Sequence, residues 1–154
     1  MDNNPKTLIL LVGPPGCGKS YYCKNWLEGY YFRISQDEMG KKEHLEEFKK
    51  ALDREEPRIV IDRMNFNVAQ RARYAAPAFV AGYVVIALVF DYNEEGCYQR
   101  ICQRENHPTL QADKAKDVIA FFKKEFQPVD LKKEHYIALT QVGNFTDWAG
   151  EFNP

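Results

Sequence analysis

The residues from Gly13 to Ser20 have the types and the spacing of a loop that holds phosphate. They read GPPGCGKS and fit the pattern G-x-x-x-x-G-K-[ST] without departure. Glycines at these positions let the backbone curl, so that successive N–H groups point at phosphate oxygens. Lys19 can reach the β- and γ-phosphates of a nucleoside triphosphate, and the Ser20 hydroxyl can bind Mg²⁺. A glycine-rich turn with a chance lysine is the weaker interpretation, because a strand-like run precedes the loop and a helix-like pattern follows it.

The sequence therefore predicts a site for a triphosphate donor, ATP or GTP, with Mg²⁺ as the metal and Ser20 as its ligand. Cys17 stands where such a loop needs a small residue, which favours a thiol that fills space over a nucleophile. No clear signature separates adenine from guanine as the base of the donor. The predicted contacts of the donor are Gly13, Pro14, Pro15, Gly16, Cys17, Gly18, Lys19, Ser20, Tyr21 and Arg100.

Carboxylates follow two later apolar runs. Asp37 and Glu38 come just after YFRIS, where a carboxylate can accept the proton of an acceptor hydroxyl as its oxygen attacks the γ-phosphate. We favour Asp37 as this base because it is closer to the strand end; the alternative is that it caps the following helix. Asp62 ends the run RIVID and can bind Mg²⁺ through water or hold the acceptor hydroxyl, while an Asx turn is the alternative.

Two arginines are spaced to work together later in the chain. Arg100 and Arg104 stand four residues apart in CYQRICQREN, so they share one face of a predicted helix. Near the γ-phosphate, their guanidinium groups would neutralise charge that develops on the transferred group. The alternative is a solvated helix flank. Their position before HPT, where a small kinase carries its lid, favours a catalytic role, with Arg104 the better candidate.

Basic residues also follow the second and third predicted strands, on the expected acceptor side of the sheet. They are Lys41, Lys42, Arg63, Arg71 and Arg73. Such residues can contact the phosphates of a nucleic acid without making the whole protein basic. The alternative is solvated surface, which is the more common fate of helical charges.

The elements that must position these residues alternate between strands and helices. Strands are predicted at 7–13, 31–35, 58–62, 83–91 and 135–140, and helices at about 18–29, 42–54, 67–82, 94–104 and 112–126. This alternation predicts an α/β fold with a five-stranded, mostly parallel sheet, right-handed crossovers and helices on both faces. In such sheets ligands bind beyond the carboxyl ends of the strands. The polar segments 13–20, 36–38 and 62–67 and Asp91 are expected there.

Composition and charge limit the number of domains, the kinds of partner and the location that the sequence predicts. With 154 residues, 45% hydrophobic and 28% charged, the chain should form one domain over residues 1–154, with a lid at about 94–115. The net charge of −1 means that a polyanion would have to be held by a local patch. No apolar run approaches the roughly 20 residues that span a bilayer, and MDNNPKT does not begin a leader, so we expect a cytoplasmic or nuclear, unsecreted protein. The four cysteines lack zinc-site spacing.

Taken together, these motifs resemble the small P-loop kinases typified by the bacteriophage-type 5′-OH polynucleotide kinase, including the kinase domains of end-healing and ligation enzymes. The counterparts are the loop at 13–20, SQDE ending at Glu38, IDRMNFN at 61–67, and Arg100 with Arg104. The resemblance implies that Asp37 is the general base, that Lys19 and Arg104 clamp the transferring phosphate, and that Ser20 binds Mg²⁺. The acceptor contacts it implies or the charges favour are Asp62, Arg63, Asn65, Arg71, Lys41 and Lys42.

The chain departs from this family's pattern on the acceptor side. Gly40 stands where an arginine is expected, and one extra residue separates Asp62 from NFN. The leading hypothesis is an ATP- or GTP-dependent kinase that phosphorylates a 5′-hydroxyl end of RNA or DNA. The alternatives are a kinase of a small metabolite, nucleoside or modified base, and a nucleotide-binding switch without acceptor chemistry. The chain could also be a module of a larger end-healing or ligation system, and the sequence leaves its oligomeric state open.

Overall fold

Parallel strands form one five-stranded sheet in the order β2-β3-β1-β4-β5. The computed structural model describes residues 4–103, 112–134 and 137–145. The strands are β1 (Thr7–Val12), β2 (Phe32–Ser35), β3 (Arg58–Asp62), β4 (Val84–Phe90) and β5 (Ile137–Val142). The helices are α1 (Lys19–Tyr22), η1 (Cys23–Leu27), α2 (Gln36–Met39), α3 (Lys41–Asp53), α4 (Val68–Val80), α5 (Glu94–Cys102) and α6 (Ala112–Glu125).

The central strand β1 is buried on both faces, which explains its continuous apolar run. It pairs in parallel with β3 on one side and β4 on the other. Leu8 and Leu10 pack with residues of α3 and α4, whereas Ile9 and Leu11 pack with residues of η1, α5 and α6. Alternate side chains of a strand point to opposite faces, so both faces must be apolar when helices cover both. The predicted α/β sheet with helices on both faces is confirmed.

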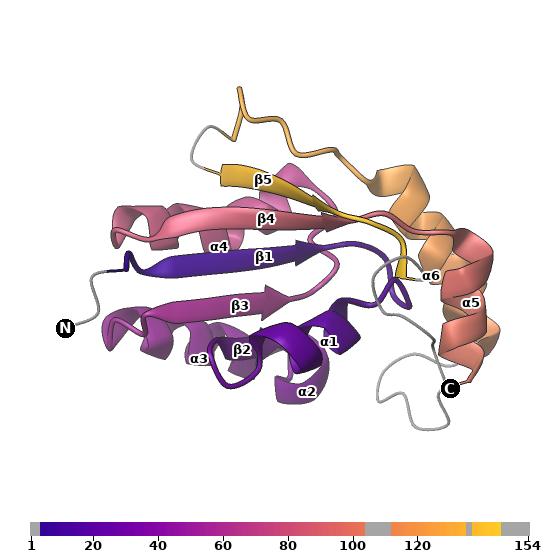
Figure 1. Cartoon of the computed structure of the whole chain (residues 1–154), viewed down its shortest axis with the longest axis horizontal. Coiled ribbons are helices and arrows are strands. Elements are labelled where there is room, and N and C mark those ends of the chain that lie inside the picture. The colour runs from indigo at the N-terminus through magenta and orange to yellow at the C-terminus, as the bar shows by residue number, and fades with distance from the viewer. Residues whose placement is uncertain (1–3, 104–111, 135–136, 146–154) are drawn as a thin grey trace.

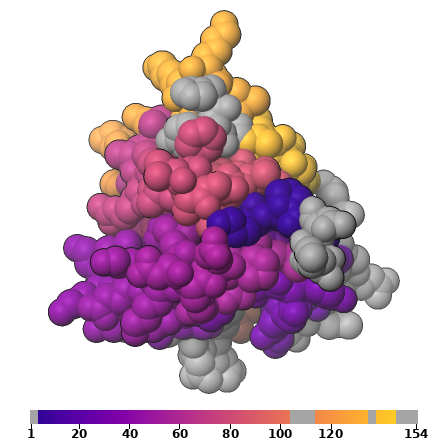
Figure 2. Space-filling view, turned by 90° about the vertical axis from the view of Figure 1, so that its left-hand side faces the viewer, coloured from indigo at the N-terminus to yellow at the C-terminus, as the bar shows by residue number. Residues whose placement is uncertain are grey.

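The carboxyl ends of the strands gather at one end of the molecule. Figure 1 shows the visible arrowheads pointing toward this end, where α5 and α6 lie, while the chain starts near the opposite end. Figure 2 views that opposite end, where the purple to magenta segments, which include α3, cover much of the lower surface. The chain runs from β1 to β2 and β3 on one side and then crosses to β4, which makes the carboxyl end of β1 the expected place for a ligand.

The first helix differs from the regular α-helix expected over 18–29. After one turn, α1 widens into η1, a π-helix in which the Glu28 N–H donates to the Cys23 carbonyl at 2.7 Å. The helix ends at Leu27, and Gly29 then adopts a φ of +92°, a conformation that favours glycine. The wider turns bury Cys23 and Leu27 against the sheet.

The helices are all too short or too polar to cross a membrane, as far as the described ranges go. The predicted lid at about 94–115 begins with α5 and ends within the first turn of α6. Its middle, including Arg104, lies outside the described residues.

Candidate phosphate-binding and transfer site

The loop between β1 and α1 closes around the ammonium group of Lys19. Its Nζ donates to the carbonyl oxygens of Gly13 at 2.7 Å and Pro14 at 2.8 Å, and only 8% of the residue is exposed. Its other contact among the described residues is the neutral Cys17 sulfur at 3.7 Å. A desolvated cation that is held by neutral groups is well suited to pair with an anion. The contact of Lys19 with a donor phosphate stays a prediction, and these surroundings suit that role.

Two glycines allow this loop to fold tightly against α5. Gly16 and Gly18 have φ values of +80° and +103°, in the region that side chains other than glycine rarely adopt. A Cβ atom on Gly16 would also lie 2.5 Å from the carbonyl oxygen of Cys97. Arg100, on the next turn of α5, donates from Nε to the Gly16 carbonyl at 2.6 Å. The structure thus brings Arg100 beside the loop, although its contact with a donor stays a prediction.

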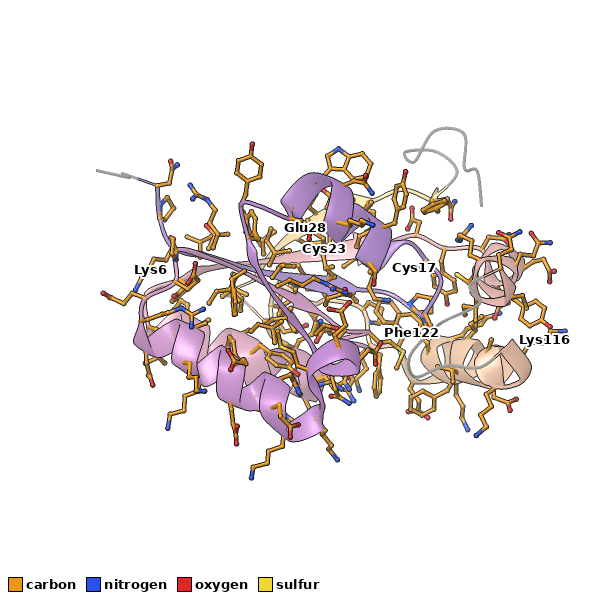
Figure 3. All side chains as sticks on the ribbon, turned by 90° about the horizontal axis from the view of Figure 1, so that it is seen from below. Lys6, Cys17, Cys23, Glu28, Lys116 and Phe122 are labelled. Carbon is orange, nitrogen blue, oxygen red and sulfur yellow. The ribbon has the colours of Figure 1, made fainter. Side chains whose placement is uncertain are left out.

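Cys17 fills space inside the loop. Its thiol is fully buried, and a Cβ atom on Gly13 would lie only 2.6 Å from Sγ. Burial raises the pKa of the Cys17 thiol above its usual value, which keeps it neutral near pH 7 even though Lys19 opposes the shift. Figure 3 shows Cys17 near the end of the sheet where α5 and α6 lie. These surroundings are those of a packed side chain.

Ser20 and Asp62 lie together where a metal would meet the donor phosphates. The Ser20 hydroxyl donates to Asp62 Oδ2 at 3.1 Å. Among the described residues, no cluster of three or more His, Cys, Asp or Glu side chains could hold a metal by itself. Mg²⁺ fits this arrangement, because it prefers oxygen ligands, retains waters and takes its remaining ligands from substrate phosphates. Ser20 and Asp62 are therefore the residues that would hold it.

The sequence analysis missed Arg33, which contacts this same carboxylate. Arg33 donates to Asp62 Oδ2 from Nε at 3.0 Å and Nη2 at 2.6 Å, and its Nη1 lies 2.8 Å from Glu38 Oε1. Burial alone would lower the pKa of Arg33, but the Asp62 and Glu38 carboxylates raise it far above its usual value, so the cation is permanent. No sequence pattern marks this contact, because Arg33 reaches Asp62 only through the pairing of Ser35 with Asp62 across β2 and β3.

Asp37 lies in the first turn of α2, at the end of β2. The helix is capped by Ser35, whose Oγ accepts from the Glu38 N–H at 3.4 Å, so the alternative that Asp37 is the cap does not apply. The Asp37 side chain is exposed, and its carboxylate has no hydrogen-bond or ion-pair partner among the described residues. Its assignment as the general base stays a prediction, and its carboxylate is accessible for that role.

Two residues predicted to contact the acceptor are instead buried. Asn65 is 0% exposed, and its Nδ2 donates to the Leu11 carbonyl at 2.8 Å. Arg71 is also 0% exposed and forms a bidentate ion pair with Glu134, at 2.8 and 3.1 Å. Both side chains hold the loop after β3 in place and do not face an acceptor. Glu134 is 63 residues away from Arg71, so no local pattern could have indicated the pair.

The other predicted acceptor contacts remain on the surface or near it. Lys41 and Lys42 are exposed in the first turn of α3, and Lys42 lies 3.9 Å from Glu46, a weak surface pair. Arg63 is half-buried, and its Nη1 donates to the Tyr74 hydroxyl at 2.6 Å. Arg104 lies outside the described residues. The sites of Lys41, Lys42 and Arg63 are compatible with a role in acceptor binding.

A buried histidine fixes the position of Arg63. His44 is 0% exposed, with Nδ1 3.0 Å from the Gly40 carbonyl and Nε2 2.8 Å from the Tyr74 hydroxyl. A carbonyl can only accept, so Nδ1 must carry the proton and Nε2 must accept from Tyr74. The Tyr74 oxygen then accepts from Arg63. With a neutral imidazole, every donor in this chain from Arg63 through Tyr74 and His44 to Gly40 has an acceptor, whereas a proton on Nε2 would leave the Tyr74 hydroxyl proton without an acceptor in the chain.

We expect acid to destabilise the fold through His44. Burial lowers the pKa of His44 below its usual 6.5, an effect that the Gly40 hydrogen bond opposes only in part. The unfolded chain then binds the proton more readily, so the contribution to stability is complete above about pH 6.5 and is lost as the pH falls through the folded-state pKa. Urea unfolding at several pH values should show a weaker pH dependence for His44→Gln than for the wild type. An identical decline in both proteins would contradict this assignment.

Comparisons with known proteins identify the family. A family model described as an AAA domain matches residues 41–129, more than half of the chain. The sequence is 31% identical, over 77% of this chain, to transcription factor bHLH140 of Arabidopsis thaliana. It is 38% identical, over 45% of this chain, to a putative bifunctional polynucleotide phosphatase/kinase of Acanthamoeba polyphaga mimivirus. The matches cover only 14% and 17% of the lengths of these two relatives.

Solved structures that share this fold include two described as kinases and one in complex with ADP-AlF3. A putative kinase from Chloroflexus aurantiacus has a TM-score of 0.64 at 14% identity, covering 97% of this chain and 93% of that chain. Kti12 from Chaetomium thermophilum, in complex with ADP-AlF3, has a TM-score of 0.62 at 15% identity, and the match covers 92% of each chain. A gluconokinase from Sinorhizobium meliloti has a TM-score of 0.54 at 16% identity, and the match covers 89% of this chain and 83% of that chain. The chain therefore belongs to the AAA domain family, and it shares its fold with these structures.

Proposed function

We propose that the protein is a Mg²⁺-dependent kinase that transfers the γ-phosphate of ATP or GTP to a 5′-hydroxyl end of RNA or DNA. The observation that carries this proposal is the grouping of Lys19, the Ser20–Asp62 pair and the accessible Asp37 carboxylate at neighbouring strand ends. Phosphoryl transfer needs these three elements, namely a phosphate clamp, a metal site and a base for the acceptor hydroxyl.

The donor would lie along the loop toward α1 and α5. Lys19 and the loop N–H groups bind its β- and γ-phosphates, and Mg²⁺ held by Ser20 and Asp62 supplies further positive charge. Tyr21 packs edge-on against Phe145 at 5.2 Å, and the Arg100 guanidinium lies 4.6 Å from the centre of the same ring. The half-buried Tyr21, directly after the phosphate loop, is the donor contact that we propose from this group.

The acceptor would approach over β2 and β3. Asp37 takes the proton of its hydroxyl while Lys19 and Arg104 neutralise the charge that spreads over the transferred group. Lys41, Lys42 and Arg63 supply positive charge on this side, which suits the phosphates of a polymer. The mimivirus relative, whose name includes a polynucleotide kinase, supports the same acceptor class.

A second candidate is phosphorylation of a small hydroxyl compound. Gly40 in place of the expected acceptor-phosphate arginine favours it, because a small neutral acceptor needs no phosphate contact at that position. The polymer acceptor is preferred because the acceptor side carries several basic side chains.

We further propose that residues 1–154 act as one domain with a lid at about 94–115, and that the protein works in the cytoplasm or nucleus.

A transfer assay with a panel of acceptors tests the function. Protein is incubated with Mg²⁺ and γ-labelled ATP or GTP, and with 5′-OH RNA, 5′-OH DNA or a nucleoside. Label should enter a polymer with a 5′-hydroxyl and not the same polymer carrying a 5′-phosphate, which is the matched control. Transfer to the nucleoside alone would select the second candidate. Nucleotide binding with no transfer to any acceptor would leave a nucleotide-binding module.

A further inference from the structure

Arg33 joins the two halves of the transfer site through a single side chain. On one side its Nε and Nη2 contact Asp62 Oδ2, the oxygen that also accepts from Ser20. On the other side its Nη1 contacts Glu38, which is adjacent to Asp37 on α2. The fork of a guanidinium group can hold two carboxylates at once in a fixed geometry. The guanidinium therefore touches the metal carboxylate and the helix that carries the candidate base.

We propose that Arg33 is a positioning residue that fixes α2 beside the metal site and, in doing so, weakens the binding of Mg²⁺ at Asp62. The side chain of Asp62 is only 5% exposed, so solvent screens its neighbours poorly. A permanent positive charge on its Oδ2 opposes a second cation at the same carboxylate. The inference rests on the proposed function for Mg²⁺ and for the transfer step, and it adds a residue that the phosphate-loop pattern does not include.

The ion pair with Glu38 gives a reason to keep an arginine that weakens Mg²⁺ binding, because the same side chain also holds α2. Helix α2 spans only Gln36–Met39, and a helix of one turn is not stable by itself. Met39 packs against the core, and the polar attachments of α2 in the described structure are the Ser35 cap and the Arg33–Glu38 pair. Glu38 is 60% exposed, so this pair contributes little to global stability but can orient the short helix. Loss of Arg33 should therefore change metal binding and transfer in opposite directions.

The deciding measurement is Mg²⁺-dependent binding of a fluorescent ATP analogue, titrated with MgCl₂ in the absence of an acceptor. For Arg33→Gln, the half-saturating Mg²⁺ concentration should fall by about tenfold, because a neutral amide no longer opposes the cation. In the transfer assay, kcat should also fall about tenfold or more, with no rise in the KM of the donor. If Arg33 were only structural, Arg33→Gln would weaken both Mg²⁺ binding and transfer. A half-saturating Mg²⁺ concentration that is unchanged or raised in this variant would overturn the proposal.

Two further variants separate charge from geometry. Arg33→Lys keeps the positive charge but cannot bridge two carboxylates, so its Mg²⁺ requirement should match the wild type while kcat falls. Glu38→Gln removes only the Arg33–Glu38 ion pair, so it should also keep the wild-type Mg²⁺ requirement and lower kcat. If Arg33→Gln does not fold, retained transfer in either of these two variants would overturn the proposal. Since the metal titration uses no acceptor, it tests Arg33 even if the wild type phosphorylates none of the acceptors offered.

Discussion

Replacing Asp37 by asparagine should lower the kcat of phosphoryl transfer by about 10²- to 10⁴-fold, the usual contribution of a positioned general base. The amide has nearly the same size but cannot take a proton from the acceptor hydroxyl. Asp37 is exposed and makes no hydrogen bond or ion pair within the described residues, so the fold should be unaffected. Affinity for ATP and Mg²⁺ should also be retained, because Lys19, Ser20 and Asp62 are unchanged. Single-turnover transfer and direct nucleotide binding, measured on the same preparation, check both parts.

The matched control for this experiment is Glu46→Gln. Glu46 is also an exposed carboxylate on the acceptor side, and within the described part of the chain its one ion pair is the 3.9 Å pair with Lys42. The control removes the same charge, so any general electrostatic effect on acceptor binding should appear in both variants. An equal loss of kcat in the two would remove Asp37 from the mechanism. Full activity of Asp37→Asn would require another base.

The sequence predicts where the polar side chains gather, because parallel strands place their carboxyl ends at one edge of the sheet. Lys19, Asp37 and Asp62 all lie at or just after a strand end, and the fold brings Ser20 into contact with Asp62. The alternation of apolar residues with turn signals also predicted the sheet and its helices on both faces, since each face of β1 must be covered. The phosphate loop, the strand ends and the covered sheet can be predicted because each depends on residues that lie close together in the sequence.

The sequence was insufficient where a side chain is held by a partner far along the chain. Arg71 was predicted to bind the acceptor because it follows N-F-N, but Glu134 draws it into the interior. Arg33 was overlooked because a lone arginine in a strand has no characteristic pattern, and only the pairing of β2 with β3 brings it to Asp62. In both cases an arginine was judged by its neighbours in sequence, whereas its role is decided by the carboxylate it meets in the fold.

The buried ion pair also gives the largest expected effect on stability. Glu134→Gln should lower the free energy of unfolding by about 3–5 kcal/mol, because it leaves the buried Arg71 cation without a counter-charge. Both side chains are essentially inaccessible, at 0% and 1% exposed. Glu134 Oε2 also accepts from the Asp130 N–H at 3.1 Å, so the segment after α6 should loosen as well. Urea unfolding followed by circular dichroism measures the change, and the exposed Lys50–Glu47 pair supplies a control in Glu47→Gln, which should leave the midpoint nearly unchanged.

A double variant distinguishes an uncompensated charge from a simple loss of packing. Arg71→Met together with Glu134→Gln removes the cation as well as its partner, so the double variant should be more stable than Glu134→Gln alone. Two costs that merely add would show that the pair is not coupled and would contradict the assignment. Because Arg71 also donates from Nη1 to the Asn65 carbonyl at 3.0 Å, the double variant should not recover full stability. Its remaining deficit measures how strongly the loop after β3, which begins directly after Asp62, depends on this buried arginine.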